Sequence, residues 1–284
     1  GTETWGSIVS PSTRCGTTGL RPSYGRISRS GAMALSWSMD KVGPISRSVE
    51  DCAIVFNALY GPDGKDLSII DVPFNYTPEV KMSDLKIGYL KTDFEKEKAD
   101  KDRKEEDDQD TSKANDEATL AKLRSMGVDL IAVELPHLPV NDLALILSAE
   151  AGAAFEEITR SRSIDLMKRQ VKDAWPNAFR MSRFIPAVEY INANRIRYLL
   201  IQEMAETLKD IDVYVAPSVE GDNLLLTNLT GQPCVVVPNG FKKDGTPTSV
   251  TFCGKLFDEA KTLAVAKAYQ DATDFHLKHP ELQQ

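Results

Sequence analysis

The sequence predicts an α/β fold, in which the strands of a sheet alternate with covering helices. Residues 85–90 form a short apolar strand pattern, residues 119–126 carry apolar side chains at helical spacing, and residues 128–136 alternate as a strand again. Val235–Val237 is a continuous apolar run, which is typical of a strand buried on both faces. Together these patterns predict an α/β layer that contains an interior strand.

Composition limits the classes of partner. The chain has 284 residues, of which 42% are hydrophobic and 27% are charged, as in ordinary globular proteins. Its net charge of −8 argues against a groove that binds nucleic acid. No apolar run approaches the roughly 18 residues that a membrane helix needs. We therefore expect neither a nucleic acid nor a membrane as partner.

Cysteine and histidine are too scattered for a metal centre or a histidine-based triad. Only three histidines are present, and the cysteines show no C-x-x-C spacing. We therefore expect no metal site and cysteines that are free thiols, mostly buried. The four cysteines are Cys15, Cys52, Cys234 and Cys253.

The N-terminal stretch presents a serine at a turn. Gly6 admits backbone angles closed to other residues, and Pro11 is tolerated in a first helical turn. Ser7 is therefore expected where a turn leads into a short helix that ends near Cys15, with backbone N–H donors and a helix dipole beside it. Such a place suits an oxyanion, although a plain Ser/Thr-rich turn explains this stretch equally well.

Residues 17–49 are expected to form short strands and turns, because glycine and proline punctuate them. Ser48 is expected to cap a helix that ends at Gly61, with Asp51 three residues further on. Four arginines in this region bind either a substrate carboxylate or, more simply, neighbouring acids and carbonyls. They are Arg21, Arg26, Arg29 and Arg47.

The middle of the chain combines a charged insert with a helical region. Residues 94–117 are expected to be an acidic, solvated insert, since they lack the spacing of a calcium loop. Residues 142–208 are expected to be mostly helical, with Glu150, Glu156 and Glu157 on a solvated face. In the same region Trp175 and Phe179 either pack in the core or, with Met181, Phe184 and Ile185, line a substrate channel. A strand over 212–217 and a closing helix over 259–276 complete the prediction.

Three ordered blocks give the chain a specific resemblance. They are Cys15–Gly31 (CGTTGLRPSYGRISRSG), Met39–Asp51 (MDKVGPISRSVED) and Asn228–Gly240 (NLTGQPCVVVPNG). In this order and at this spacing they resemble the amidase signature family. The opening, Gly1–Ser12 (GTETWGSIVSPS), is similar to the end of that signature and to its GTET-type branch, which includes peptide amidases.

The resemblance implies a fold, a reaction and a set of site residues. The fold is a mixed β-sheet covered by helices on both faces, spanning residues 1–284 as the C-terminal portion of one amidase domain that is incomplete at its N-terminus. The reaction is hydrolysis of a small linear carboxylic amide through an acyl-enzyme on Ser7, in a Ser–cis-Ser–Lys mechanism without metal or organic cofactor. The N–H groups of Thr4, Trp5, Gly6 and Ser7 are implied to form the oxyanion hole.

The family's lysine and bridging serine, the latter in a GGSSGG-like loop, stand ahead of the nucleophile. Residues 1–284 contain neither, so we expect a chain that is nearly inert alone, and that associates with the upstream segment or with itself. A cytoplasmic location is expected, with the natural N-terminus unseen.

Departures from the pattern leave alternatives open. Trp5 stands where the family has a small or acidic residue, Val9 replaces an arginine, and Ser249–Thr251 replaces G-x-Q. One alternative is the glutaminase component of a tRNA-dependent amidotransferase, against which the GTET opening and the acidic charge weigh. The other is a non-catalytic amidase-like scaffold that binds without turnover.

Overall fold

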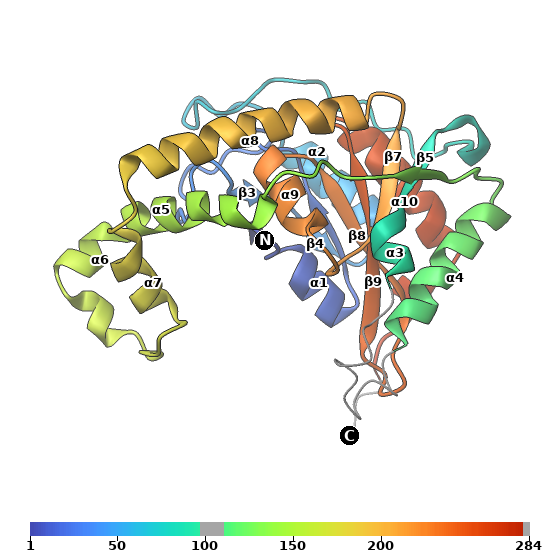
Figure 1. Ribbon diagram of the computed structural model, residues 1–284. Helices are drawn as coiled ribbons and strands as arrows, with labels where there is room; N and C mark the ends of the chain where they lie inside the picture. The colour runs from blue at the N-terminus through green and yellow to red at the C-terminus, as the bar shows by residue number, and fades with distance from the viewer. Residues whose placement is uncertain (97–110, 281–284) are drawn as a thin grey trace.

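The computed structural model describes residues 1–96 and 111–280 (Figure 1). Its main strands are β2 (Thr18–Arg21), β4 (Ile45–Ser46), β5 (Ile87–Leu90), β6 (Ile131–Val133), β7 (Val213–Pro217), β8 (Cys234–Phe241) and β9 (Pro247–Gly254). They form a seven-stranded mixed sheet in the order β4-β2-β8-β9-β7-β5-β6. A separate two-stranded sheet pairs β1 (Thr2–Glu3) with β3 (Lys41–Val42) in antiparallel fashion.

The helices connect these strands and cover them. They are α1 (Val9–Cys15), α2 (Val49–Leu59), α3 (Lys91–Glu95), α4 (Ser112–Ser125), α5 (Leu145–Ala154), α6 (Glu156–Arg160), α7 (Trp175–Ser182), α8 (Ala187–Thr207), α9 (Asn223–Thr230) and α10 (Glu259–Asp271). Short 3₁₀ turns occur at Met82–Asp84, Val140–Ala144, Ser163–Leu166 and Phe275–Leu277. Within the described ranges, none of the helices is both long and apolar enough to cross a bilayer.

Two hydrophobic cores lie on opposite faces of the sheet. Side chains alternate along a strand, so Val213 and Val215 of β7 join one core while Tyr214 joins the other. The first core packs against α2, α4 and α10, and the second against α1, α5, α8 and α9. Val235–Val237 are fully buried across both cores, which confirms the predicted interior strand. The expected mixed sheet with helices on both faces is likewise confirmed.

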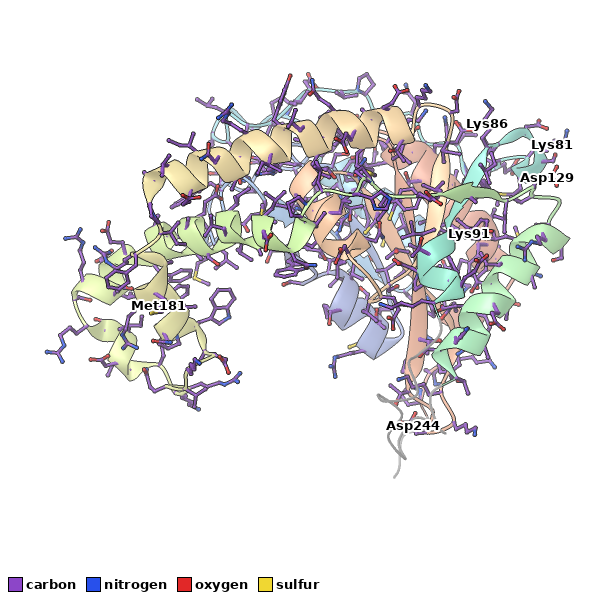
Figure 2. All side chains as sticks on the ribbon, viewed as in Figure 1. Lys81, Lys86, Lys91, Asp129, Met181 and Asp244 are labelled. Atoms are coloured by element: carbon purple, nitrogen blue, oxygen red, sulfur yellow. The ribbon has the colours of Figure 1, made fainter. Side chains whose placement is uncertain are left out.

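The predicted strand–helix–strand unit forms a parallel layer. β5 and β6 pair in parallel, and α4 precedes β6 in the connection between them. The helix begins earlier than predicted, at Ser112. Most of the predicted acidic insert (94–117) lies outside the described residues. At its first edge Phe94 is buried in α3. Figure 2 shows Lys81, Lys86 and Asp129 near the outer edge of this layer, and Lys91 on α3.

The helix predicted at Ser48 begins as its sequence indicates. The Ser48 hydroxyl accepts the N–H of Asp51 at 3.1 Å, and the Asp51 carboxylate accepts the N–H of Ser48 at 3.1 Å. This reciprocal capping box satisfies two N–H groups that the first helical turn leaves open. It fixes where α2 starts and so aims Phe56 into the first core.

The predicted helical region 142–208 forms a lobe beside the sheet. Figure 1 shows α5 leading away from the sheet and the helices packed on it, which we call the body, to α6 and α7. Helix α8 runs back from the lobe over the body. Inside the lobe Phe179 stacks on Phe155 with ring centroids 4.5 Å apart, and Trp175 stacks on Phe179 at 5.4 Å. Glu156 pairs with Arg160 and Arg183 on the surface. The lobe is therefore held by a small aromatic cluster of its own.

Candidate active site

Ser7 lies in the turn that joins β1 to α1, and its side chain is exposed. Pro11 falls in the first turn of α1, where the missing N–H of proline costs nothing. The helix ends at Cys15, and Gly16 follows in the left-handed conformation with φ 62°. The structure thus has the turn and the short helix that the N-terminal sequence predicts.

Glu3 organises this turn from inside the protein. One carboxylate oxygen accepts the backbone N–H groups of Ile8 and Val9 at 2.8 and 3.0 Å. The other accepts Nη1 of Arg21 at 2.9 Å and Nδ2 of Asn228 at 2.8 Å. Burial opposes ionisation, but the Arg21 charge and these hydrogen bonds hold the pKa of Glu3 below its usual value. A buried anion therefore anchors the loop that carries Ser7.

Glu3 also corrects one expectation from the sequence. The N–H groups at the start of α1 are not open to an oxyanion, because Glu3 already binds those of Ile8 and Val9. The turn itself retains unused donors: the N–H groups of Trp5, Gly6 and Ser7 make no hydrogen bond to any described residue. These three successive donors precede the helix and stand next to the Ser7 hydroxyl.

A second carboxylate ties the Ser7 turn to the loop before β3. The Thr4 hydroxyl donates to Asp40 Oδ1 at 2.6 Å, while Asp40 Oδ2 accepts the N–H groups of Leu35 and Ser36 at 2.8 and 2.9 Å. Asp40 thereby joins the Ser7 turn to the loop at residues 35–40 through a single side chain. Since β1 also pairs with β3, the turn is held on two sides. Ser7 is thus presented by a rigid frame.

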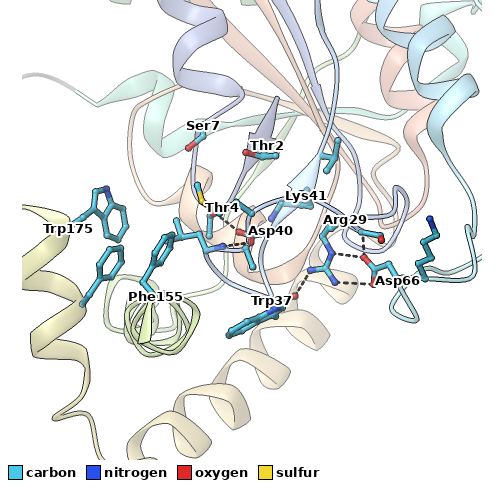
Figure 3. A pocket seen from close by; sticks show the side chains of 18 of the residues that line it. Thr2, Thr4, Ser7, Arg29, Trp37, Asp40, Lys41, Asp66, Phe155 and Trp175 are labelled. Atoms are coloured by element: carbon cyan, nitrogen blue, oxygen red, sulfur yellow. Dashed lines mark hydrogen bonds and ion pairs between the residues drawn. The ribbon is translucent and has the colours of Figure 1, made fainter. Parts of the chain in front are cut away.

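Ser7 opens into a cavity of about 640 Å³ between the body and the lobe (Figure 3). From the body, its lining includes Thr2, Thr4, Ser7, Arg29, Ser30, Met33, Leu35, Trp37, Asp40, Lys41, Lys65 and Asp66. From the lobe, it includes Phe155, Met167, Trp175 and Phe179. A volume of this size holds a ligand of several hundred daltons. Of the channel candidates, Trp175 and Phe179 line the cavity, whereas Met181, Phe184 and Ile185 do not.

Lys41 is an unusual member of this lining. It is 2% exposed, and no carboxylate of the described residues lies within 4.0 Å of its ammonium group. Its Nζ donates to the carbonyl oxygen of Met39 and, at 3.5 Å, to that of Asn228. Burial and the nearby Arg21 charge hold the pKa of Lys41 well below its usual value. The protein thus keeps a buried amine at the cavity wall.

The arginines of residues 17–49 turn out to hold loops. Arg21 pairs with Glu3, Arg26 with Glu259 at 3.1 Å, and Arg29 with Asp66 at 2.9 Å. Arg47, in contrast, donates to a backbone carbonyl. Among the four, Arg29 is the one that lines the cavity, where its hydrogen bond to Asp66 lowers the pKa of that carboxyl. These pairings agree with the simpler of the two interpretations of the cluster.

Glu150 does not belong to a solvated face, which corrects the sequence-based expectation. It is 7% exposed and accepts the Ser36 hydroxyl at 2.5 Å, the Ser38 N–H at 3.0 Å and the Tyr190 hydroxyl at 2.7 Å. Burial opposes ionisation, yet these donors keep the pKa of Glu150 below its usual value. Arg197 binds the Ser38 hydroxyl and carbonyl, both at 2.7 Å. Helices α5 and α8 therefore fix the loop that carries Trp37.

Sequence reasoning did not single out several of these residues, and the signals differ. Asp40 and Lys41 lie in the block Met39–Asp51, which carries the family resemblance. The sequence indicates that this block matters, but it does not reveal which residues Asp40 and Lys41 contact. Glu150 was noticed only as part of a charge pattern. The described part of the chain holds no group of three or more His, Cys, Asp or Glu side chains placed to hold a metal ion.

The amidase family profile matches residues 1–223 of this chain. The chain belongs to the amidase signature family. The family resemblance is therefore confirmed. The match includes the blocks Cys15–Gly31 and Met39–Asp51, the Ser7 turn and both walls of the cavity, whereas the block Asn228–Gly240 lies beyond the matched residues.

Individual amidases and related proteins extend this finding. The chain is 30% identical to a glutamyl-tRNA(Gln) amidotransferase subunit of Geotalea daltonii, covering 99% of the chain and 65% of that protein. An amidase family protein of Bacillus anthracis superposes with TM-score 0.80 at 28% identity, over 99% of this chain and 58% of that one. Native peptide amidase of Stenotrophomonas maltophilia gives 0.77 at 25% identity, over 96% and 62%. The chain thus spans less than two thirds of each relative.

Proposed function

We propose that this amidase hydrolyses linear carboxylic amides through an acyl-enzyme on Ser7. The observation that carries the proposal is the exposed Ser7 hydroxyl, facing a cavity and preceded by N–H groups that no described residue uses. Family membership supports amide hydrolysis in general. The assignment of Ser7, with Thr4, Trp5, Gly6 and Ser7 around the oxyanion, rests on the resemblance and on this geometry.

The proposed reaction proceeds in two half-reactions. Ser7 Oγ bonds to the amide carbonyl carbon and gives up its proton, and the carbonyl oxygen becomes an anion held by backbone N–H groups of the turn. The C–N bond then breaks, and the nitrogen leaves as ammonia or an amine after taking a proton. Water attacks the resulting ester, which releases the carboxylate and restores the Ser7 hydroxyl. Water is the co-reactant, and no redox step is required.

Activation of Ser7 needs a base. A serine at its free pKa is a weak nucleophile, and the Ser7 hydroxyl has no hydrogen-bond partner among residues 1–96 and 111–280. We infer that the family's lysine acts through its bridging serine, and residues 1–284 hold no segment that matches either. This polypeptide by itself is therefore expected to turn over amides very slowly.

A second candidate function is suggested by named relatives. Several proteins about 30% identical to this chain are named as subunits of glutamyl-tRNA(Gln) amidotransferase. On that proposal the cavity binds glutamine and Ser7 releases ammonia for a ligase reaction. The third possibility is an amidase scaffold that binds amides without cleaving them. Turnover of glutamine favours the amidotransferase component, turnover of other amides favours the amidase, and turnover of neither favours the binding scaffold.

That the chain associates with an upstream segment or with itself stays a prediction. Helix α8 exposes apolar side chains on one stretch, including Val188, Ile191 and Leu199, each more than 50% exposed. Exposed apolar patches of this kind favour self-association or the binding of another segment. Sedimentation of the chain, with and without any residues encoded ahead of Gly1, measures this directly.

The proposed function is tested by ammonia release. Simple, aryl and peptide amides and glutamine are offered to the chain and to its Ser7→Ala variant, each with and without any residues encoded ahead of Gly1. We expect turnover that needs both Ser7 and the preceding residues. Turnover that survives Ser7→Ala overturns the assignment of the nucleophile, and inactivity of every form on every amide favours the binding scaffold.

A further inference from the structure

The cavity beside Ser7 has two chemically different walls. The lobe contributes Phe155, Met167, Trp175 and Phe179, and each of these side chains is apolar. The charged lining residues all come from the body. Figure 3 shows Trp175 and Phe155 on the same side of the cavity as Ser7, whereas Arg29 and Asp66 stand on the other side. A ligand that reaches Ser7 therefore meets an aromatic wall next to it.

The aromatic wall is preformed and yet only partly covered. Phe155 and Phe179 are nearly parallel, with 13° between their ring planes, and Trp175 stacks on Phe179 at 25°. Phe179, the middle ring of the stack, is 3% exposed, whereas Trp175 is 47% exposed. The outer residue of the stack is thus accessible over about half of its surface. An exposed aromatic face gains free energy when a second flat ring is placed on it.

Leu35 links this wall to the catalytic frame. It packs against the lobe cluster of Ala151, Ile164 and Phe179, and its N–H donates to Asp40, which also accepts the Thr4 hydroxyl. The wall and the Ser7 turn are therefore connected through one short loop. A group resting on the wall has a defined position relative to the Ser7 hydroxyl, as a substrate-positioning surface requires.

We propose that this wall is the binding site for the acyl portion of the substrate, and that the preferred substrates are amides whose acyl group carries an uncharged aromatic ring. The inference rests on the proposed function of Ser7. During acyl transfer the amine leaves while the acyl group stays bonded to Ser7, so the wall on the Ser7 side serves both half-reactions. A small acyl group leaves Trp175 exposed to water and fills only a small part of the 640 Å³ cavity.

The test compares four substrates in the protein with any residues encoded ahead of Gly1 included. These are propionamide, 3-phenylpropionamide, N-benzylpropionamide and glutamine. We expect kcat/KM for 3-phenylpropionamide to exceed that for propionamide by about 10-fold or more, as the apolar burial of a ring predicts. N-benzylpropionamide carries the same ring on the leaving group and is expected to show no such gain.

Matched variants locate the preference. Trp175→Ala is expected to remove most of the preference for 3-phenylpropionamide over propionamide. Trp175→Phe keeps an aromatic face and is expected to restore much of it, which separates loss of the wall from loss of folding. Phe184→Ala is the control, because Phe184 is an aromatic residue of the same lobe that is 80% exposed and does not line the cavity.

A binding measurement in a variant without the proposed nucleophile tests the aromatic wall separately from the proposed amide hydrolysis. In the Ser7→Ala variant, calorimetry is expected to show tighter binding of 3-phenylpropionamide than of propionamide. Equal kcat/KM for all amides, or a preference for N-benzylpropionamide, overturns the acyl wall while leaving amide hydrolysis in place. No turnover together with selective ring binding overturns the hydrolysis and leaves the aromatic site standing.

Discussion

Glu3 and Arg21 form an ion pair of 2.9 Å in which neither side chain has any solvent exposure. Glu3 belongs to β1, directly before the Ser7 turn, and Arg21 ends β2 in the main sheet. Arg21 also donates to the carbonyl of Gln232 at 3.0 Å. A single buried pair thus connects the candidate nucleophile's loop to the centre of the fold.

Neutralising Glu3 is expected to be strongly destabilising. Glu3→Gln leaves the Arg21 guanidinium buried without its counter-charge, and breaking a buried pair in this way costs about 3–5 kcal/mol. Urea unfolding of the variant measures the loss. Asp84→Asn is the control, because its pair with Lys81 is largely exposed and surface ion pairs contribute little to stability. A loss no larger than in that control contradicts the buried role.

A second buried pair is expected to show strong coupling. Glu259 accepts Nε of Arg26 at 3.1 Å and the N–H of Ser23 at 2.8 Å, and the Arg26 guanidinium lies over the rings of Phe56 and Tyr60. Arg26→Met and Glu259→Gln each leave one partner buried and unpaired.

In a double-mutant cycle we therefore expect the combined variant to lose less stability than the sum of the two, by about 0.5–3 kcal/mol. Thermal unfolding of all four forms provides the numbers. The exposed pair of Lys209 and Glu206 serves as reference, and its coupling is expected to be much weaker because solvent screens the two charges. Strict additivity for Arg26 and Glu259 is the result that rejects this account.

The sequence revealed features that depend on near neighbours. The capping box at Ser48 and the run Val235–Val237 were predicted correctly, because their signals lie within a few residues. Glu3 was not recognised as the organiser of the turn, since one of its partners, Asn228, is 225 positions away. Glu150 was misassigned for the same reason: its partner Ser36 is 114 positions distant, and a helix pattern carries no trace of it.

The structure gives a physical reason for the glycine at position 43 in the block Met39–Asp51. A Cβ atom placed on Gly43 would lie 2.0 Å from the carbonyl oxygen of Leu20 and 2.8 Å from Cδ of Pro22. Backbone, and not a flexible side chain, fills that space, so Gly43→Ala forces β2 and the Gly43 loop apart. We expect a loss of at least about 3 kcal/mol, measured by urea unfolding.

Gly64→Ala is the matched control for that substitution. Gly64 has φ 74° and no heavy atom within 4 Å of the added Cβ, so the change adds only backbone strain of about 1–2 kcal/mol. If Gly43→Ala were no more harmful than Gly64→Ala, the close approach of the two backbone segments would not be present in solution.

Lys41 is expected to give the protein a distinctive pH dependence. Burial and the charge of Arg21 lower its pKa in the folded state, with Arg197 acting in the same direction and Glu3 and Asp40 opposing. Between that lowered pKa and about 10.4, the unfolded chain binds the proton and the folded chain does not. The free energy of unfolding contributed by Lys41 therefore rises with pH across this window, by up to about 1.4 kcal/mol per pH unit.

Lys41→Met removes the titrating amine while keeping a side chain of similar length. The stability of this variant relative to the natural chain is expected to fall as the pH rises from the lowered pKa of Lys41 toward about 10, because only the natural chain gains from losing the proton. Lys81→Met, at an exposed position, controls for the change in net charge. A stability difference between Lys41→Met and the natural chain that stays constant over this range would mean that Lys41 keeps its proton in the fold, and that a counter-charge reaches it in solution.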